Sequence, residues 1–309
     1  MPGADVSIII VNYNSWGFVI PLVKRLTGLQ KKTFQIIVID NASTLAPPSE
    51  WNDIQNAHLI NFIGNKINKG YAGGINDALL LVKNEYVLIM NPDIEVPDGG
   101  IEMLCDYLKE HKSVSAVSPG IKRPCDAIPA YSPRRFPNLL TAFSELLHIN
   151  DLFKHNPFAS YYFYDYKEFK KPVCVETVLG AVMMFRTSVL RELNGMDSSF
   201  FLYFEETDLF KRMSDNGLKL CYLPETIFIH HHGQSSMTTS YRETTYYKSM
   251  SYYFKKHHSI ISFLLVKSCI IIGAVMEITY FFLKHILKKE DKDSSKKHII
   301  NCIKRIITM

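Results

Sequence analysis

The sequence lacks the motifs of several common protein classes. Its six cysteines are scattered with no Cys-x-x-Cys pair, which argues against a zinc site and a disulfide framework and favours a reducing compartment. No His-Glu-x-x-His or Gly-x-Ser-x-Gly occurs, which disfavours a zinc hydrolase and an α/β-hydrolase. The first residues have no basic n-region, and their apolar run is only as long as a strand, so no signal peptide is predicted.

The composition that is present indicates a packed protein with a basic tail. The 309 residues suffice for one large domain with an appendage or for two domains, and 47% apolar against 21% charged residues fits a packed core. Residues 284–309 hold eight Lys/Arg and three Asp/Glu, which accounts for the whole net charge of +5. Such a tail suits nucleic acid or an anionic membrane, and the segment before it decides between them.

The first half of the chain alternates strand and helix patterns. Near-continuous apolar runs at Val6–Asn12, Phe34–Asp40 and Tyr86–Met90 predict buried parallel strands, with further strands at 58–64 and 114–118. Helices are predicted from a Ser15 cap to about Leu29, in the second half of 71–83, and at 100–111. This alternation predicts an α/β fold with a doubly wound, mostly parallel sheet, whose ligands bind at the carboxyl ends of the strands.

The second half is less regular. Residues 119–172, crowded with prolines and aromatics, predict an irregular or partly helical insertion that either lies near a substrate or packs its own aromatics on the surface. The sheet resumes at 173–186, an acid-rich helix runs over 204–217 with Gly217 as its stop, and a strand follows at 218–223. A first domain is therefore predicted over residues 1–240, and a C-terminal helical region over 241–309.

Residues 259–283 form a strongly apolar helix pattern before the basic tail. The length suits a membrane span, but Lys267 and Glu277 interrupt it, so a helix lying in an anionic membrane surface fits better. The alternative is a buried helix of a C-terminal bundle or of an interface in a homo-oligomer. We predict membrane association and no nucleic-acid partner.

Five groups of residues could carry chemistry, and each has a plain structural alternative. Asp40 ends a buried strand and could bind a base or sugar, or cap a turn. The stretch NKGYAGGIN (68–76) could bring backbone N–H groups to a phosphate, or it could be a glycine-rich helix start. Asp93, with Glu95 nearby, could bind a divalent cation that a nucleoside diphosphate also ligates, or could simply form an Asn-Pro-Asp turn.

The other two groups lie later in the chain. Glu205, Glu206 and Asp208 stand together at a helix start, where acids stabilise the helix dipole, but their mutual repulsion would also suit a general base. The three consecutive histidines at 230–232 could supply a ligand nitrogen or form an exposed loop.

The chain resembles the inverting family 2 glycosyltransferases with a GT-A fold, and most of all the bacterial branch that includes rhamnosyltransferases of cell-surface polysaccharide assembly. The resemblance covers roughly residues 5–240 and rests on the order of seven segments: VSIIIVNYNS, IIVIDNAST, NKGYAGGIN, YVLIMNPDIEV, VETVLGAVMMFR, FFLYFEETDLFKR and HHHGQSS.

The resemblance implies roles for individual residues. Asp93 is the remaining acid of an Asp-x-Asp motif for Mg²⁺ or Mn²⁺, in which Asn91 replaces the first Asp. His230 matches a histidine that joins the metal–diphosphate site, with His231 or His232 in its place if the register shifts. Glu206 matches the catalytic base, usually an Asp, and Asp208 belongs to the same catalytic cluster. The nucleotide and diphosphate site is implied to contain Asn12, Tyr13, Asn14, Asp40, Asn68, Gly70, Gly73, Gly74, Asn76 and Asp93.

The implied activity is inverting, metal-dependent transfer of a sugar from a dTDP- or UDP-linked donor, with dTDP-rhamnose first, to a hydroxyl of a growing lipid-linked polysaccharide. The enzyme is expected at the cytoplasmic face of the inner membrane. The alternatives are another donor sugar (galactofuranose, glucose or N-acetylhexosamine) and a non-catalytic nucleotide-binding scaffold. A nucleotidyltransferase is disfavoured because NYNSWG is not the glycine-rich basic loop that it needs after its first strand.

Overall fold

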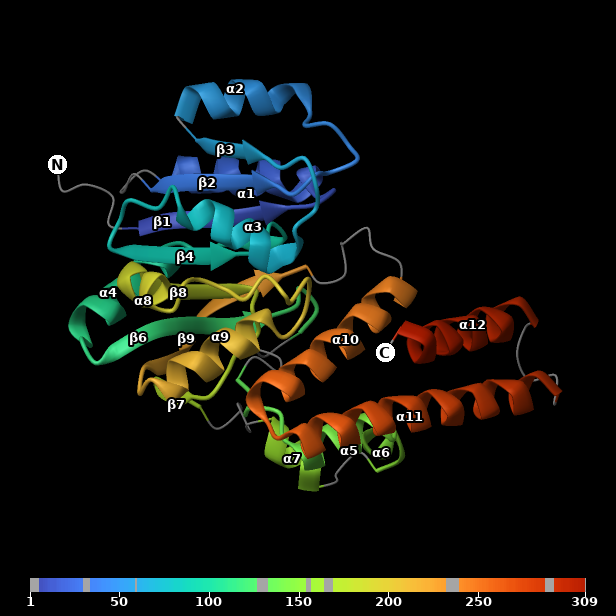
Figure 1. Cartoon of the computed structure of the whole chain (residues 1–309). Coiled ribbons are helices and arrows are strands. Elements are labelled where there is room, and N and C mark those ends of the chain that lie inside the picture. The colour runs from blue at the N-terminus through green and yellow to red at the C-terminus, as the bar shows by residue number, and fades with distance from the viewer. Residues whose placement is uncertain are drawn as a thin grey trace. The chain divides into compact units, whose positions relative to one another are not determined.

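The computed structural model describes two compact units of the chain (Figure 1). The first contains Met1–Phe136, Phe163–Phe201 and Glu205–Ser236, and the second contains Pro137–Tyr162, Leu202–Phe204 and Met237–Met309. Within these units the structure describes residues 6–29, 34–58, 60–126, 133–153, 157–163, 169–231, 239–286 and 292–308.

A nine-stranded sheet forms the centre of the first unit, in the order β3-β2-β1-β4-β8-β6-β9-β5, with β7 paired to β9. The strands β1 to β4 are parallel to one another, β8 runs antiparallel between β4 and β6, and β6 and β9 are again parallel. The strands are β1 (Val6–Asn12), β2 (Gln35–Asp40), β3 (Asn61–Gly64), β4 (Tyr86–Met90), β5 (Ile94–Glu95), β6 (Val114–Lys122), β7 (Val173–Val175), β8 (Val182–Arg186) and β9 (Lys219–His230).

Helices cover both faces of this sheet, because the central strands are apolar on both sides. Ile8 and Ile10 of β1 pack into a cluster with α1, α2 and α4, whereas Ile9 and Val11 pack into a second cluster with α3, α8 and α9. The predicted α/β class with a largely parallel sheet is therefore confirmed. These helices are α1 (Trp16–Gly28), α2 (Ser49–His58), α3 (Gly70–Leu79), α4 (Gly100–Glu110), α8 (Thr187–Glu192) and α9 (Glu205–Asp215).

Three local predictions about these elements differ from the structure, two in an element's bounds and one in a helix cap. Helix α3 begins at Gly70, before the predicted start, because the Asn68 side chain accepts a hydrogen bond from the Gly70 N–H (2.9 Å) at its N-terminus. Ser15 precedes α1, but its hydroxyl donates to the Tyr13 carbonyl (3.1 Å) and makes no side-chain cap. The strand predicted at 218–223 continues to His230, which carries the histidine segment to the edge of the sheet.

The second unit consists of helices, including three from the predicted insertion at 119–172. Its longest helix, α11, contacts both α10 and α12, and a Cβ at Gly273 would lie 2.2 Å from the Leu146 carbonyl oxygen, so α5 approaches α11 where only glycine fits. The helices are α5 (Leu139–Leu146), α6 (Ile149–Leu152), α7 (Pro157–Tyr162), α10 (Thr239–His257), α11 (Ile260–Ile286) and α12 (Lys292–Thr308).

Glu277, which interrupts the apolar pattern of α11, lies in a polar cluster within this unit. Its carboxylate accepts two hydrogen bonds from Arg305 of α12 (2.9 and 2.6 Å) and lies 3.0 Å from His148 Nε2.

The residues of α11 that the structure describes as exposed are uncharged. The stretch Ile260–Lys284 is long and apolar enough to cross a membrane, with a mean hydropathy of 2.1 and 28% of it buried in the structure. These exposed residues include Ile261, Leu264, Leu265, Ile271, Ile272, Val275, Met276, Tyr280 and Leu283.

Candidate functional site

The carboxyl ends of β1 and β2 hold a buried Asn12–Asp40 pair. These residues are opposite each other in the parallel register, and Asn12 Nδ2 donates to Asp40 Oδ1 over 2.8 Å. Asn12 Oδ1 accepts from the Ser15 N–H (2.9 Å), and the Ser43 hydroxyl also bonds to Asp40. The predicted acid at the end of β2 is therefore oriented by its neighbours and lies at the edge where a base or ribose would bind.

Asn14 shapes the loop that follows β1. Its backbone is left-handed (φ 54°), a conformation that Asn tolerates better than most residues. Its Oδ1 accepts hydrogen bonds from Thr44 N (2.7 Å) and Leu45 N (3.3 Å), which ties the β1 loop to the β2 loop. Tyr13, between Asn12 and Asn14, is half-buried in the same loop.

Asn41, which follows Asp40, organises the start of α3. Its Nδ2 donates to Asn68 Oδ1 (2.9 Å) and to the Gly70 carbonyl (2.8 Å), and its Oδ1 accepts from Lys69 N (3.1 Å). Asn41 is absent from the residues implied by the resemblance. The signal that could have found it is its position directly after a predicted ligand at a strand end.

The glycines of the 68–76 segment allow α3 to pack closely. A Cβ at Gly70, whose φ is +74°, would lie 2.2 Å from the Phe201 carbonyl oxygen, and a Cβ at Gly74 would lie 2.9 Å from Val11. A Cβ at Gly73 would meet the Lys69 side chain at 2.6 Å. The Asn76 side chain donates to Met196 O (2.7 Å) and accepts from Met196 N (2.9 Å). These residues build the α3 N-terminus at the site edge, and the Asn76 amide is engaged by the 196–198 loop.

Asp93 and His230 meet at the other end of this edge. Antiparallel pairing places Ile94 of β5 opposite His230 of β9, and His230 Nε2 lies 3.1 Å from Asp93 Oδ1. The Asn91 amide nitrogen is 3.4 Å from the same imidazole nitrogen. Within the histidine run 230–232, the structure describes His230 and His231, and His230 is the one whose ring lies beside Asp93. His232 lies outside the described residues.

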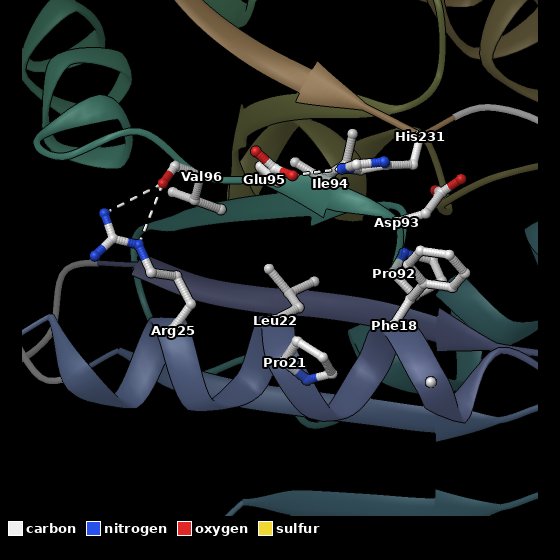
Figure 2. A pocket seen from close by; sticks show the side chains of 11 residues that line it. Phe18, Pro21, Leu22, Arg25, Pro92, Asp93, Ile94, Glu95, Val96 and His231 are labelled. Carbon is white, nitrogen blue, oxygen red and sulfur yellow. Dashed lines mark hydrogen bonds and ion pairs between the residues drawn. The ribbon is translucent and has the colours of Figure 1, made fainter. Parts of the chain in front are cut away.

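His231 belongs to a neighbouring surface cavity of about 490 Å³ (Figure 2). Figure 2 shows Phe18, Pro21, Leu22 and Arg25 of α1 along one side and the segment Pro92–Val96 along the other. The His231 ring contacts the exposed Glu95 carboxylate, and the His231 N–H donates to the Asp93 carbonyl (3.0 Å). Asp93 therefore lines this cavity and also contacts His230 at the carboxyl edge of the sheet.

The three acids of α9 have different surroundings. Burial and the neighbouring Glu206 carboxylate raise the pKa of Glu205 well above its usual value, so Glu205 takes up a proton before an ordinary carboxyl would. Glu206 lies 3.6 Å from Arg134 Nη2. Asp208 is fully buried and accepts from Arg212 Nε (2.9 Å), while the rest of that guanidinium donates to the carbonyls of Leu193 and Gly195. Through Arg212, Asp208 therefore ties α9 to the Leu193–Gly195 segment.

Two further residues near Glu206 carried no clear signal in the sequence. Arg134 comes from the predicted insertion and is held by backbone bonds to Thr177 (2.8 and 3.1 Å). Tyr71 belongs to the glycine-rich segment, and burial together with the charges of Glu205, Glu206 and Asp93 raises its pKa well above the usual value. The acids of α9 and Asp93 after β4 therefore act electrostatically on the same buried phenol.

The donor atoms at Asp93 and His230 suit a divalent cation. A carboxylate oxygen and an imidazole nitrogen 3.1 Å apart can ligate one Mg²⁺ or Mn²⁺ ion, whose remaining ligands would come from a diphosphate and water. Over the described residues, no cluster of three or more His, Cys, Asp or Glu side chains forms a complete protein site. The arrangement therefore fits a metal that is bound together with a nucleoside diphosphate.

Comparisons with known proteins agree with this geometry. A family model described as glycosyl transferase family 2 matches residues 7–193, and a model described as the N-terminal domain of galactosyltransferase matches residues 162–234. An N-acetylglucosaminyl-diphospho-decaprenol L-rhamnosyltransferase of Mycobacterium tuberculosis (strain ATCC 25618 / H37Rv) is 22% identical over 236 residues, which cover 72% of this chain and 75% of that protein. Rhamnosyltransferase WbbL of Escherichia coli (strain K12) is 26% identical over 235 residues, covering 73% and 83%.

A solved structure shares the fold. The mannosyltransferase of Pyrobaculum calidifontis, solved in complex with GDP-Man and Mn²⁺, superimposes with a TM-score of 0.58 at 13% identity. The match covers 99% of this chain and 87% of that one. The GT-A architecture predicted from the sequence is confirmed by this likeness.

Proposed function

The chain belongs to glycosyl transferase family 2, and from that premise we propose that it transfers a sugar from a nucleoside-diphosphate donor to a hydroxyl group of a glycan, with inversion at the anomeric carbon. The observation that carries the proposal is the meeting of Asp93 and His230, 3.1 Å apart, at the strand edge that also holds the Asn12–Asp40 pair. In this proposal the Asn12–Asp40 end of the edge binds the base, and the Asp93–His230 end binds the diphosphate.

The protein groups have distinct tasks in this reaction. Asp40 accepts hydrogen bonds from the donor's base, and the positive end of the α3 dipole, whose N-terminus is fixed by Asn41, favours the negative charge of the diphosphate. Asp93 and His230 would hold a divalent cation, which neutralises the charge of the departing nucleoside diphosphate when it is bound.

Glu206 is the general base of the proposed reaction. Its carboxylate takes the proton of the acceptor hydroxyl while that oxygen attacks the anomeric carbon from the face opposite the leaving group. Arg134, 3.6 Å away, orients the Glu206 carboxylate. We assign to Asp208 an anchoring role, in place of the catalytic role implied by the resemblance, because its fully buried carboxylate is engaged by the partly buried Arg212.

The first candidate donor is dTDP-rhamnose. It is supported by two similar proteins that are rhamnosyltransferases, and the lipid-linked acceptor is supported by the decaprenol-linked substrate in the name of one of them. The match of residues 162–234 to a galactosyltransferase domain keeps galactose-type donors as the alternative.

Association with the cytoplasmic face of a membrane is a second part of the proposal. Helix α11 exposes an uncharged apolar face, and the basic side chains of α12 include exposed Lys296, Lys297 and Lys304. An apolar face beside basic residues suits an anionic lipid surface, where a lipid-linked acceptor would be found.

A donor screen tests the proposal. Each reaction contains the purified protein, Mn²⁺ and a synthetic prenyl-diphosphate N-acetylglucosamine as acceptor. The donor in separate reactions is dTDP-rhamnose, UDP-galactofuranose, UDP-glucose or UDP-N-acetylglucosamine, and a parallel series lacks the metal. We expect dTDP release and a rhamnosylated product that forms only with metal. Product from a UDP-sugar would correct the donor, whereas no nucleoside diphosphate release from any donor would contradict the proposed function.

A further inference from the structure

Tyr71 connects the N-terminal turn of α3 to two loops beside the predicted base. Its backbone N–H donates to the Phe201 carbonyl (2.9 Å), and its phenol donates to the Gly180 carbonyl (3.2 Å). The Phe201 carbonyl lies shortly before α9, and Gly180 lies shortly before β8. One residue thus holds the two segments that lead into the elements around Glu206.

Gly180 packs directly against the Glu206 side chain. A Cβ added at Gly180 would lie 3.3 Å from both Cβ and Cγ of Glu206 and 3.4 Å from its carboxyl carbon. Such distances are tighter than nearly all real Cβ contacts, so any side chain at position 180 would displace Glu206 by a few tenths of an ångström. The Gly180 backbone is therefore one wall of the space in which the Glu206 carboxylate is held.

The charges around Tyr71 keep it in the form that this contact requires. Burial raises its pKa, and the carboxylates of Glu205, Glu206 and Asp93 raise it further. The raised pKa favours the protonated phenol, which is the form that donates to the Gly180 carbonyl.

We propose that Tyr71 is a positioning residue for the general base Glu206, acting through the Gly180 carbonyl. The inference rests on the proposed role of Glu206. Tyr71 fixes the wall formed by Gly180, and that wall restricts the Glu206 carboxylate to the position from which it takes the acceptor proton. The role concerns the chemical step and leaves donor binding to the Asp40 and Asp93 ends of the site.

The test compares three single variants. Tyr71→Phe removes the phenol oxygen, and Gly180→Ala inserts the Cβ that meets Glu206. Ser118→Ala is the matched control, because the buried Ser118 hydroxyl donates to the carbonyl of Val182 (2.9 Å), two residues beyond Gly180 in the same segment. All three are measured for kcat and donor KM with the donor identified in the screen, for Mn²⁺-dependent binding of its nucleoside diphosphate, and for thermal stability.

The proposal predicts a separation between chemistry and binding. Tyr71→Phe should lower kcat about fivefold, the worth of one hydrogen bond, with donor KM and nucleotide binding unchanged. Gly180→Ala should lower kcat about tenfold, since small displacements of a catalytic group are costly. In the double variant the losses should be less than multiplicative, because both act on the same wall. Ser118→Ala should lower the melting temperature but keep kcat within about twofold of the wild type.

Three results would overturn the inference: a kcat within twofold of wild type for Tyr71→Phe, losses that fall on donor KM, or an equal loss of kcat in Ser118→Ala. If Tyr71→Phe fails to fold, a kcat within twofold of wild type in Gly180→Ala still overturns the inference, because Tyr71 would then hold a wall that does not position Glu206; the Gly180 backbone conformation permits alanine. An active Glu206→Gln variant would instead refute the base assignment itself, which distinguishes failure of the proposed function from failure of the positioning role.

Discussion

His230 Nε2 lies 3.1 Å from Asp93 Oδ1, although the two residues belong to segments far apart in the chain. The contact is fixed by the backbone, because β5 and β9 pair antiparallel with Ile94 opposite His230, and the His231 N–H donates to the Asp93 carbonyl (3.0 Å). An acid and a histidine are therefore presented together as a pre-formed pair at the edge of the sheet.

Asp93→Asn and His230→Ala should each weaken Mn²⁺-dependent binding of a nucleoside diphosphate by about tenfold or more, because each removes one of the two protein ligands. Isothermal titration with dTDP in Mn²⁺ and in EDTA measures the effect. His231→Gln is the matched control, since its partner is the exposed Glu95 and its ring does not reach the Asp93–His230 pair. Equal losses in His231→Gln, or unchanged affinity in both ligand variants, would contradict the assignment.

The strands of this site could be predicted from the sequence, and the contacts between them could not. The runs ending at Asn12, Asp40 and Met90 are the observed strands within one residue at either end, because buried parallel strands carry an unambiguous apolar pattern. The order of the segments also predicted the fold class. The antiparallel insertion of β8 and the pairing of β5 with β9 depend on long-range register, which has no local signal.

The lack of a local signal for long-range contacts also explains why the sequence did not reveal Arg134 and Asn41 and did not separate the three acids of α9. Arg134 lies 3.6 Å from Glu206 but belongs to a segment without periodicity. The Asn41 side chain forms hydrogen bonds with four residues from a later segment of the chain. The Glu205–Glu206–Asp208 cluster reads as three equivalent acids in the sequence. Packing separates them, because Arg212 engages Asp208, while burial and the neighbouring Glu206 carboxylate raise the pKa of Glu205.

Glu206→Gln should abolish transfer while nucleotide binding persists. Glutamine keeps the shape of the side chain but cannot take a proton, and the loss of a general base costs about 10²–10⁴ in kcat. Product formation with the donor found in the screen, measured beside dTDP affinity, checks both parts. Asp208→Asn should instead lower the melting temperature, since it weakens the buried contact to Arg212. A fully active Glu206→Gln enzyme would refute the assignment.

Glu205→Gln should stabilise the protein at neutral pH. The pKa of Glu205 is higher in the folded than in the unfolded state, so the folded state binds more protons, and stability falls as the pH rises from the unfolded pKa to the folded one. Glu205→Gln removes this pH-dependent loss of stability, because glutamine does not titrate. A gain of about 1 kcal/mol would raise the melting temperature by about 2–4 °C in a domain of this size. Thermal melts from pH 4 to pH 8 should converge at the acid end, and a constant difference at every pH would contradict the prediction.

Gly70→Ala and Gly217→Ala should separate backbone strain from steric overlap. Both glycines have positive φ, +74° and +70°, so each substitution carries a backbone cost of about 1 kcal/mol. The Cβ at position 217 enters open space, whereas at position 70 it would lie 2.2 Å from the Phe201 carbonyl oxygen. We expect Gly70→Ala to be at least about 2 kcal/mol less stable than Gly217→Ala by urea unfolding. Equal stability would show that the Phe201 loop moves away at little cost.

Glu277→Gln should destabilise the helical unit although Glu277 lies in an apolar helix. Removing one partner of a largely buried ion pair leaves the Arg305 guanidinium without its bidentate acceptor, which typically costs about 3–5 kcal/mol. Asp215→Asn breaks the exposed Lys211–Asp215 pair of α9 and serves as the control, with an expected change below about 1 kcal/mol. Chemical unfolding followed by circular dichroism measures both, and similar values for the two variants would contradict a structural role for the Glu277–Arg305 pair.

Ile272 and Met276 lie one turn apart on the uncharged face of α11, 50% and 44% exposed. If this face enters a lipid surface, replacing both by Asp should weaken binding to phosphatidylglycerol vesicles about tenfold or more, because burial of each side chain contributes about 1.5–3 kcal/mol. Leu80, 85% exposed on the first unit, gives the matched control: Leu80→Asp should leave vesicle binding unchanged. Sedimentation with anionic and with zwitterionic vesicles separates the apolar from the electrostatic contribution to vesicle binding, since the exposed lysines of α12 favour the anionic lipid. A wild-type protein that remains in the supernatant with both vesicles, and forms dimers through α11 instead, would refute the membrane proposal.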